Sequence, residues 1–268
     1  MSLPKMRNIV SAKEDKHDDY GFRIFTEMGM PLCSDDFWGM KHDLPEMPAW
    51  VNDVHNKFTG RCYLFGTGPS LTGQLPLLGA LKEAKTFTCN RMAKWKDLPF
   101  TPWLHCVTEP APFIRWGVGV LPQYDYPAAQ NRVACIWYRV SAPGWLWLPK
   151  APDDVQVRWQ SYWGTQPELP PVPTAWASPL TIGQLALWMG FTELFLLGCD
   201  TTQTGQAWDP VYGRTQQKRN IRSIIECAER AYRDVTRAGR ILRDCTPGGR
   251  LNVEGAIPYV SLQEVLPI

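Results

Sequence analysis

The chain has 268 residues, a net charge of +2 and 44% hydrophobic residues. This length and apolar content suffice for one large α/β domain, and the small net charge gives no reason to expect a polyanionic partner. No run of about eighteen apolar residues occurs, and the first residues are polar, so we expect a soluble cytoplasmic protein without a membrane span or signal peptide.

The alternation of apolar runs and helical patterns predicts the fold class. Residues 1–58 mix charged residues with prolines and show few periodic apolar positions, so we predict an irregular N-terminal arm. From 59 to 268 we predict a Rossmann-like domain, a mostly parallel sheet with helices on both faces and a Trp- and Pro-rich insertion near 137–175. The predicted strands are 61–66, 85–89, 103–107, 132–140, 155–159, 193–198 and 240–245, and the predicted helices are 71–83, 178–189 and 214–238.

Residues 61–70 read Arg-Cys-Tyr-Leu-Phe-Gly-Thr-Gly-Pro-Ser, which predicts a strand, a glycine turn and a helix N-terminus. Backbone N–H groups at such a turn, together with the helix dipole, favour a bound phosphate. We therefore predict that a nucleotide binds at Gly66, Thr67, Gly68, Pro69 and Ser70. The segment is neither the full dinucleotide fingerprint nor a P-loop, and an ordinary strand-to-helix turn also explains its glycines on steric grounds.

Three polar residues stand directly after predicted strands: Asn90, Glu109 and Asp200. The carboxyl ends of parallel strands meet at one edge of a sheet, where ligands of open α/β sheets bind. We predict that Asp200 binds a hydroxyl group, binds a metal ion or acts as a base. Each of the three residues is also typical of a turn or cap without function.

The eight cysteines form no Cys-x-x-Cys pair, and the four histidines show no ligand spacing with them. We therefore predict reduced thiols in the core and no structural metal site.

Three segments, 65–71, 87–90 and 177–200, carry a Gly-Thr-Gly-Pro-Ser-Leu loop, a strand ending in Thr-Cys-Asn, and a Ser-Pro-Leu-Thr helix that leads to a Leu-Gly-Cys-Asp strand end. Their order and spacing resemble the bacterial sialyltransferases of glycosyltransferase family 42. The related 6-hydroxymethylpterin diphosphokinase-like (MptE-like) proteins share the Gly-Pro-Ser-Leu loop and a similar late Gly-x-Asp. The resemblance covers about 61–110 and 175–247.

The resemblance implies a cytidine nucleotide-sugar as donor and no further cofactor. It places the glycine loop, Asn90 and Ser178 on this donor, and Tyr212 near the leaving phosphate; Arg214, at the predicted helix start, is also suited to a diphosphate. Family members use a histidine as base shortly before the last long helix, but this chain has none after His105. A carboxylate such as Asp200, Asp209 or Glu109 would then take the proton, or the chemistry differs from that of a sialyltransferase.

Three functions remain open from the sequence. The first is a glycosyltransferase-like enzyme that transfers an activated sugar to a hydroxyl of a glycan, a small molecule or a nucleic acid. The second is a magnesium-dependent, diphosphokinase-like phosphotransferase with Glu109 and Asp200 on the metal ion. The third is a non-catalytic protein that binds nucleotides or nucleic acid through the arginine-rich segment 214–243, for which a solvated helix face with ion pairs is the alternative explanation.

Overall fold

A computed structural model describes residues 48–108, 113–114, 119–120, 124–136, 142–149, 177–201, 207 and 221–267. Contacts divide the chain into two units, Met1–Met40 and Lys41–Ile268, and every described residue belongs to the second. Within the described residues, no helix combines the length and apolar character needed to cross a bilayer.

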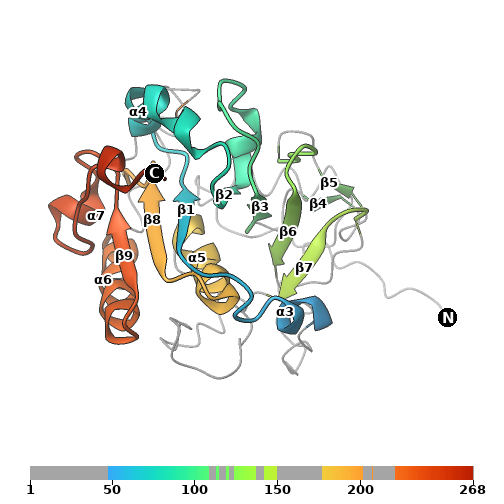
Figure 1. Cartoon of the computed structure of the whole chain (residues 1–268). Coiled ribbons are helices and arrows are strands. Elements are labelled where there is room, and N and C mark those ends of the chain that lie inside the picture. The colour runs from blue at the N-terminus through green and yellow to red at the C-terminus, as the bar shows by residue number, and fades with distance from the viewer. Residues whose placement is uncertain are drawn as a thin grey trace, which may run out of the picture. The chain divides into compact units, whose positions relative to one another are not determined.

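The centre of the fold is a seven-stranded sheet, in which every pair of neighbouring strands is parallel. Its order is β7-β6-β3-β2-β1-β8-β9, which can be followed across Figure 1. The chain therefore adds β2, β3, β6 and β7 in turn on one side of β1, and then returns to add β8 and β9 on the other side. The strands are β1 (Arg61–Phe65), β2 (Thr86–Cys89), β3 (Leu104–Val107), β6 (Asn131–Ile136), β7 (Leu146–Pro149), β8 (Glu193–Leu197) and β9 (Ile241–Asp244).

Alternating strand residues enter two hydrophobic clusters on opposite faces of the sheet, as the pleat requires. Cys62 and Leu64 of β1 join one cluster with side chains of α3, α5 and α6, whereas Tyr63 and Phe65 join the other with α4 and the short 3₁₀ turns. A separate hairpin pairs β4 (Phe113–Ile114) with β5 (Gly119–Val120). The helices are α3 (Ala49–Asp53), α4 (Ser70–Leu78), α5 (Ser178–Met189), α6 (Ile221–Arg237) and α7 (Arg250–Val253), and the 3₁₀ turns are η1 (Gly79–Leu81), η2 (Asn90–Lys94) and η3 (Leu262–Val265).

Helix α5 is buried on all sides: every residue from Pro179 to Met189 is inaccessible to solvent or nearly so. Such a helix has no polar face to present to water, so it packs as a layer of the core against β1, β2 and β8. Because α5 leads into the amino end of β8, its own N-terminus lies at the opposite, carboxyl edge of the sheet. The fold thus brings Ser178 to the edge at which the strands end.

The predicted fold class, a parallel α/β sheet with helices on both faces, is confirmed. The predicted helix 71–83 is too long, because α4 ends at Leu78 and tightens into η1 at Gly79, a residue with low helix propensity. The edge strand β7 and the hairpin were not predicted, and helix α3 forms near the end of the predicted arm, with Val51 in the core. The predicted strand 155–159 and residues 214–220 of the predicted last helix lie outside the described residues.

The seven described cysteines are buried and free, which confirms the predicted reduced thiols for this part of the chain. His105 is also fully buried, with its Nδ1 3.0 Å from the Thr88 hydroxyl and its Nε2 2.8 Å from the Tyr124 carbonyl oxygen. A carbonyl oxygen only accepts, so Nε2 carries the proton and Nδ1 accepts from Thr88. Burial lowers the pKa of His105 to about 4.

This burial predicts a pH-dependent contribution to stability. The folded pKa lies below the ordinary value of 6.5, so the unfolded chain binds the proton more tightly and the free energy of unfolding falls as the pH drops from 6.5 toward 4. Relative to His105→Asn, the wild-type protein should lose about 2 kcal/mol between pH 7 and pH 5.

Urea unfolding of both proteins at the two pH values measures this change. The contribution of Asp244, whose pKa burial raises to about 6, acts in the opposite direction but is common to both proteins and cancels in the difference. A difference that does not change with pH would contradict the burial of a neutral imidazole.

Candidate functional site

The order of the strands marks one switch point of the sheet. The direction of chain growth reverses between β1 and β8, and open α/β sheets bind ligands outside the carboxyl ends of the strands at such a switch point. The glycine loop follows β1 and Asp200 follows β8, while Asn90 follows β2 on the other side of β1. With neighbouring strands about 4.8 Å apart, β2 and β8 lie about 10 Å apart, on either side of β1.

The glycine loop packs directly on the loop after β8. The amide of Gly66 donates to the Leu197 carbonyl at 2.7 Å, and the amide of Gly68 donates to the Gly198 carbonyl at 2.8 Å. A Cβ atom on Gly66 would overlap the Gly198 carbonyl oxygen, and one on Gly68 would come within 2.6 Å of the same atom and overlap the Asp200 carboxylate. The glycines are therefore required by the approach of two loops of the protein, as the steric explanation of the sequence proposes.

Asp200 lies at the N-terminus of α4. Its Oδ2 accepts from the Ser70 hydroxyl at 2.8 Å, and its Oδ1 accepts from the Ser70 amide at 3.2 Å. A carboxylate there interacts favourably with the helix dipole, as a bound anion would. We expected the loop amides to face a ligand, but those of Gly66, Gly68 and Ser70 all bind the β8 loop.

Burial raises the pKa of Asp200, and the two hydrogen bonds from Ser70 oppose that shift. Its carbonyl is also fixed, because it accepts from the Arg250 amide at 3.2 Å and from the Thr201 hydroxyl at 2.7 Å. A carboxylate with a raised pKa, fixed at a strand end, is a suitable proton acceptor for chemistry at this edge.

A second polar cluster joins β2, β3 and α5. The Asn90 Nδ2 donates to the Ser178 hydroxyl at 2.8 Å, the Asn90 Oδ1 accepts from the Thr108 amide at 2.9 Å, and the two hydroxyls lie 2.8 Å apart. Asn90 adopts a left-handed conformation, with φ 47°, which asparagine tolerates better than most residues. The structure thus brings together Asn90 and Ser178, two of the predicted donor-binding residues.

Ser178 does not cap helix α5. The N-cap of α5 is Ala177, no side chain caps the helix, and Ser178 is its first residue. Thr108 was missed by the sequence analysis, although its position directly before Glu109, at the end of a predicted strand, is a signal that could have found it. The hydroxyl of Ser178 serves the polar cluster rather than the helix.

Several predicted residues cannot be placed. Glu109, Asp209, Tyr212 and Arg214 lie outside the described residues, as does most of the Trp-rich insertion. Among the residues that the structure describes, no three His, Cys, Asp or Glu side chains are arranged to hold a metal ion. Trp145, from the insertion, is buried next to His105.

Comparison with known proteins adds no assignment: no family model matches the chain, and neither a curated protein nor a solved structure matches it. The interpretation of the site therefore depends on its own geometry.

Because the two loops are in contact, replacement of Gly68 and of Gly73 by alanine should change the free energy of unfolding in opposite directions. Gly68→Ala should lower the free energy of unfolding by about 3 kcal/mol, because the new methyl group has no space. Gly73→Ala is the matched control, since a Cβ on this α4 residue would meet nothing within 4 Å and should stabilise the helix by about 0.5–1 kcal/mol. Urea unfolding of the two variants measures both effects. Equal stability of the two would contradict the close packing of the loops.

Proposed function

We propose that the chain binds a nucleotide-activated donor at the switch point and transfers the activated group, a sugar, to a hydroxyl acceptor. The observation that carries this proposal is the convergence of two separate polar clusters on either side of the glycine loop, Asn90–Thr108–Ser178 and Asp200–Ser70. The resemblance of three segments to the sialyltransferases of glycosyltransferase family 42 supports this class of reaction.

The Asn90 cluster suits binding of the donor, and the Asp200 carboxylate suits transfer of the proton from the acceptor. Amide and hydroxyl groups, as in the Asn90 cluster, both donate and accept, so they can exchange their mutual hydrogen bonds for those of nucleoside hydroxyls. In the transfer, the bond between the sugar carbon and the phosphate oxygen breaks, and the phosphate keeps the electron pair. The acceptor oxygen forms the new bond to that carbon, and its proton passes to the Asp200 carboxylate.

Asp200 is the described group best suited to this proton. His105 has both nitrogens in hydrogen bonds and a pKa of about 4, and so cannot replace the histidine that the related enzymes use. The raised pKa of Asp200 increases its basicity, and the acceptor hydroxyl would take the place of the Ser70 hydroxyl as its partner. Tyr212 and Arg214 remain predictions for the leaving phosphate.

One described feature bears on each of the two alternatives. A magnesium-dependent phosphotransferase would need Asp200 on the metal ion, where each of its oxygens accepts one hydrogen bond from Ser70 and keeps a further lone pair. For nucleic-acid binding, the described part of the basic segment is 221–243, and three arginines of its helix α6 pair with acids of the same helix. Arg222 Nε lies 2.8 Å from Glu226 and Arg237 lies 3.4 Å from Asp234, so ion pairs on a solvated face explain this composition.

Donor binding can be tested with two serine variants. Ser178→Ala removes a hydroxyl from the Asn90 cluster and should weaken donor binding by about tenfold. Ser261→Ala removes an N-cap in η3, so it should cost about 1 kcal/mol of stability without changing donor affinity. The measurement is the shift in melting temperature over a series of nucleotides and nucleotide-sugars, including cytidine nucleotides. If no compound stabilises the wild-type protein, the proposed function is wrong.

A substitution of Asp200 can distinguish a role in catalysis from a role in donor binding. Asp200→Asn keeps an oxygen for the Ser70 amide and nearly the same shape, but it cannot take a proton. We expect kcat to fall at least about 100-fold while the Kd for the donor changes by less than about threefold. Release of the nucleotide from a donor that binds the wild-type protein measures kcat. An unchanged kcat would assign the proton to another residue.

A further inference from the structure

Asp244, the last residue of β9, carries a fully buried carboxylate. Its Oδ1 accepts from the Thr246 amide at 3.0 Å, and its Oδ2 accepts from the Asn252 Nδ2 at 2.8 Å. No described lysine or arginine forms an ion pair with it. Burial of a carboxylate without a counter-ion costs free energy, so the structure that its two hydrogen bonds hold explains its presence.

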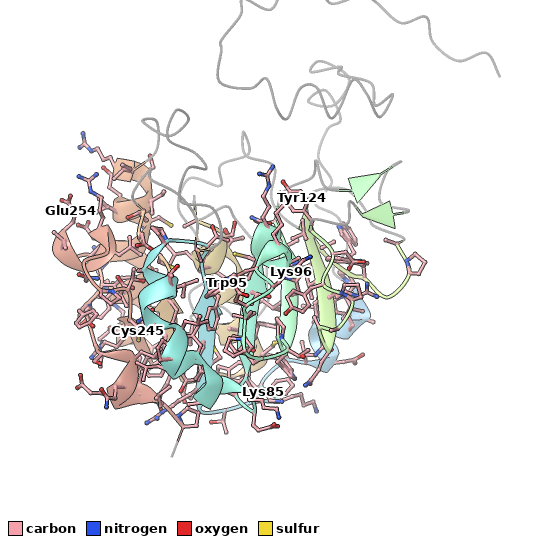
Figure 2. The ribbon with its side chains drawn as sticks, turned by 90° about the horizontal axis from the view of Figure 1, so that it is seen from above. Lys85, Trp95, Lys96, Tyr124, Cys245 and Glu254 are labelled. Atoms are coloured by element: carbon pink, nitrogen blue, oxygen red, sulfur yellow. The ribbon has the colours of Figure 1, made fainter. Side chains whose placement is uncertain are left out.

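These hydrogen bonds close the turn 245–254, whose two ends, Cys245 and Glu254, are labelled in Figure 2. The Asn252 Nδ2 donates also to the Thr246 carbonyl at 2.7 Å, and the Gly249 amide donates to the same oxygen at 3.1 Å. One side-chain amide of α7 thus joins the Asp244 carboxylate to the start of the turn.

The turn holds the main chain of the loop after β8 at two consecutive residues. The fully buried Thr246 accepts with its Oγ1 from the Cys199 amide at 3.0 Å. The Arg250 amide donates to the Asp200 carbonyl at 3.2 Å. Removal of the Asp244 carboxylate would therefore loosen the segment from which the Asp200 side chain extends to α4.

The charge of Asp244 acts on Asp200 as well. Burial raises the pKa of Asp244 to about 6, hydrogen bonds from Thr246 and Asn252 lower it, and the charge of Asp200 raises it further. This repulsion is mutual, so an ionised Asp244 favours the protonated form of Asp200. The other titratable or charged side chains on the elements that contact Asp244 are those of Cys199, Arg243, Cys245, Arg250, Glu254 and Tyr259.

We infer that Asp244 is a positioning residue for Asp200 and acts through Thr246 and the turn 245–254. This inference rests on the proposed function, in which Asp200 takes the proton of the acceptor, and it names the group that holds this base in place. The sequence analysis did not select Asp244, because it lies inside the predicted strand 240–245.

Nuclear magnetic resonance of the full chain, labelled with ¹³C at its aspartate carboxyl groups and with ¹⁵N, tests the inference without any ligand. In Asp244→Asn, the Asp200 carboxyl signal should titrate at lower pH than in the wild-type protein, because the neighbouring charge is gone. Loss of one signal in Asp200→Asn assigns it. An amide nitrogen cannot accept from Asn252, so exchange of the Cys199 and Arg250 amides with D₂O should become about tenfold faster.

Two variants of Thr246 test the same path with both carboxylates in place. Thr246→Val removes the hydroxyl that accepts from the Cys199 amide, whose exchange should become about tenfold faster. Thr246→Ser keeps this hydroxyl and should retain the wild-type rate. The matched control is Asn131→Ala, which removes a side-chain hydrogen bond to the Trp103 carbonyl at the amino end of β6 and should change neither the titration nor the exchange.

Thermal unfolding establishes that each variant is folded, and the Thr246 pair decides the test if Asp244→Asn does not fold. An unchanged titration of Asp200 in a folded Asp244→Asn protein, or equal exchange of the Cys199 amide in Thr246→Val and Thr246→Ser, would overturn the positioning role. Neither measurement needs a donor, so these failures are distinct from failure of the proposed function, which donor binding and nucleotide release test.

Discussion

The approach of the loop after β1 to the loop after β8 is the constraint on which the site depends. Two amides of the glycine loop donate to carbonyls at the end of β8, those of Leu197 and Gly198, and the side chain of Asp200 then reaches the first residue of α4. Any side chain at Gly66 or Gly68 would separate these loops, because its Cβ would overlap the Gly198 carbonyl or the Asp200 carboxylate. Since β1 and β8 form the switch point of the sheet, this contact lies at the edge where open α/β sheets bind ligands.

The buried helix α5 gives the other side of the site its position. A helix that is buried on all sides lies between the sheet and the remaining core, and its direction is set by the strand that it enters. Its first residue, Ser178, therefore reaches the ends of β2 and β3, where Asn90 and Thr108 complete a hydrogen-bonded cluster. The packing of the buried helix α5 thus sets the position of the Ser178 hydroxyl, whose partners no local sequence pattern indicates.

The sequence predicted the fold better than the chemistry of the site. Alternating apolar runs identify β1, β2, β3 and β8 because buried parallel strands have few other compositions. The same reasoning left the glycines open to a ligand or to steric packing, since a sequence does not show whether a close approach is made by a phosphate or by another loop. Thr108 was not selected because its partner, Ser178, is distant in sequence. An interaction between side chains so far apart leaves no periodic signal.

The N-terminus of a helix can stabilise the charge of a bound ligand or that of a side chain of the protein, and Asp200 is an example of the second case. In a phosphate-binding loop the helix dipole acts on the ligand, whereas here it acts first on a carboxylate of the protein. Such an arrangement stabilises the charged carboxylate, and burial destabilises it, so the pKa of Asp200 is raised by less than burial alone would raise it. The protein thereby keeps a carboxylate with a raised pKa at this edge of the sheet. Under the proposed function, the phosphate of the donor would have to bind away from this carboxylate, because the two negative charges would repel each other.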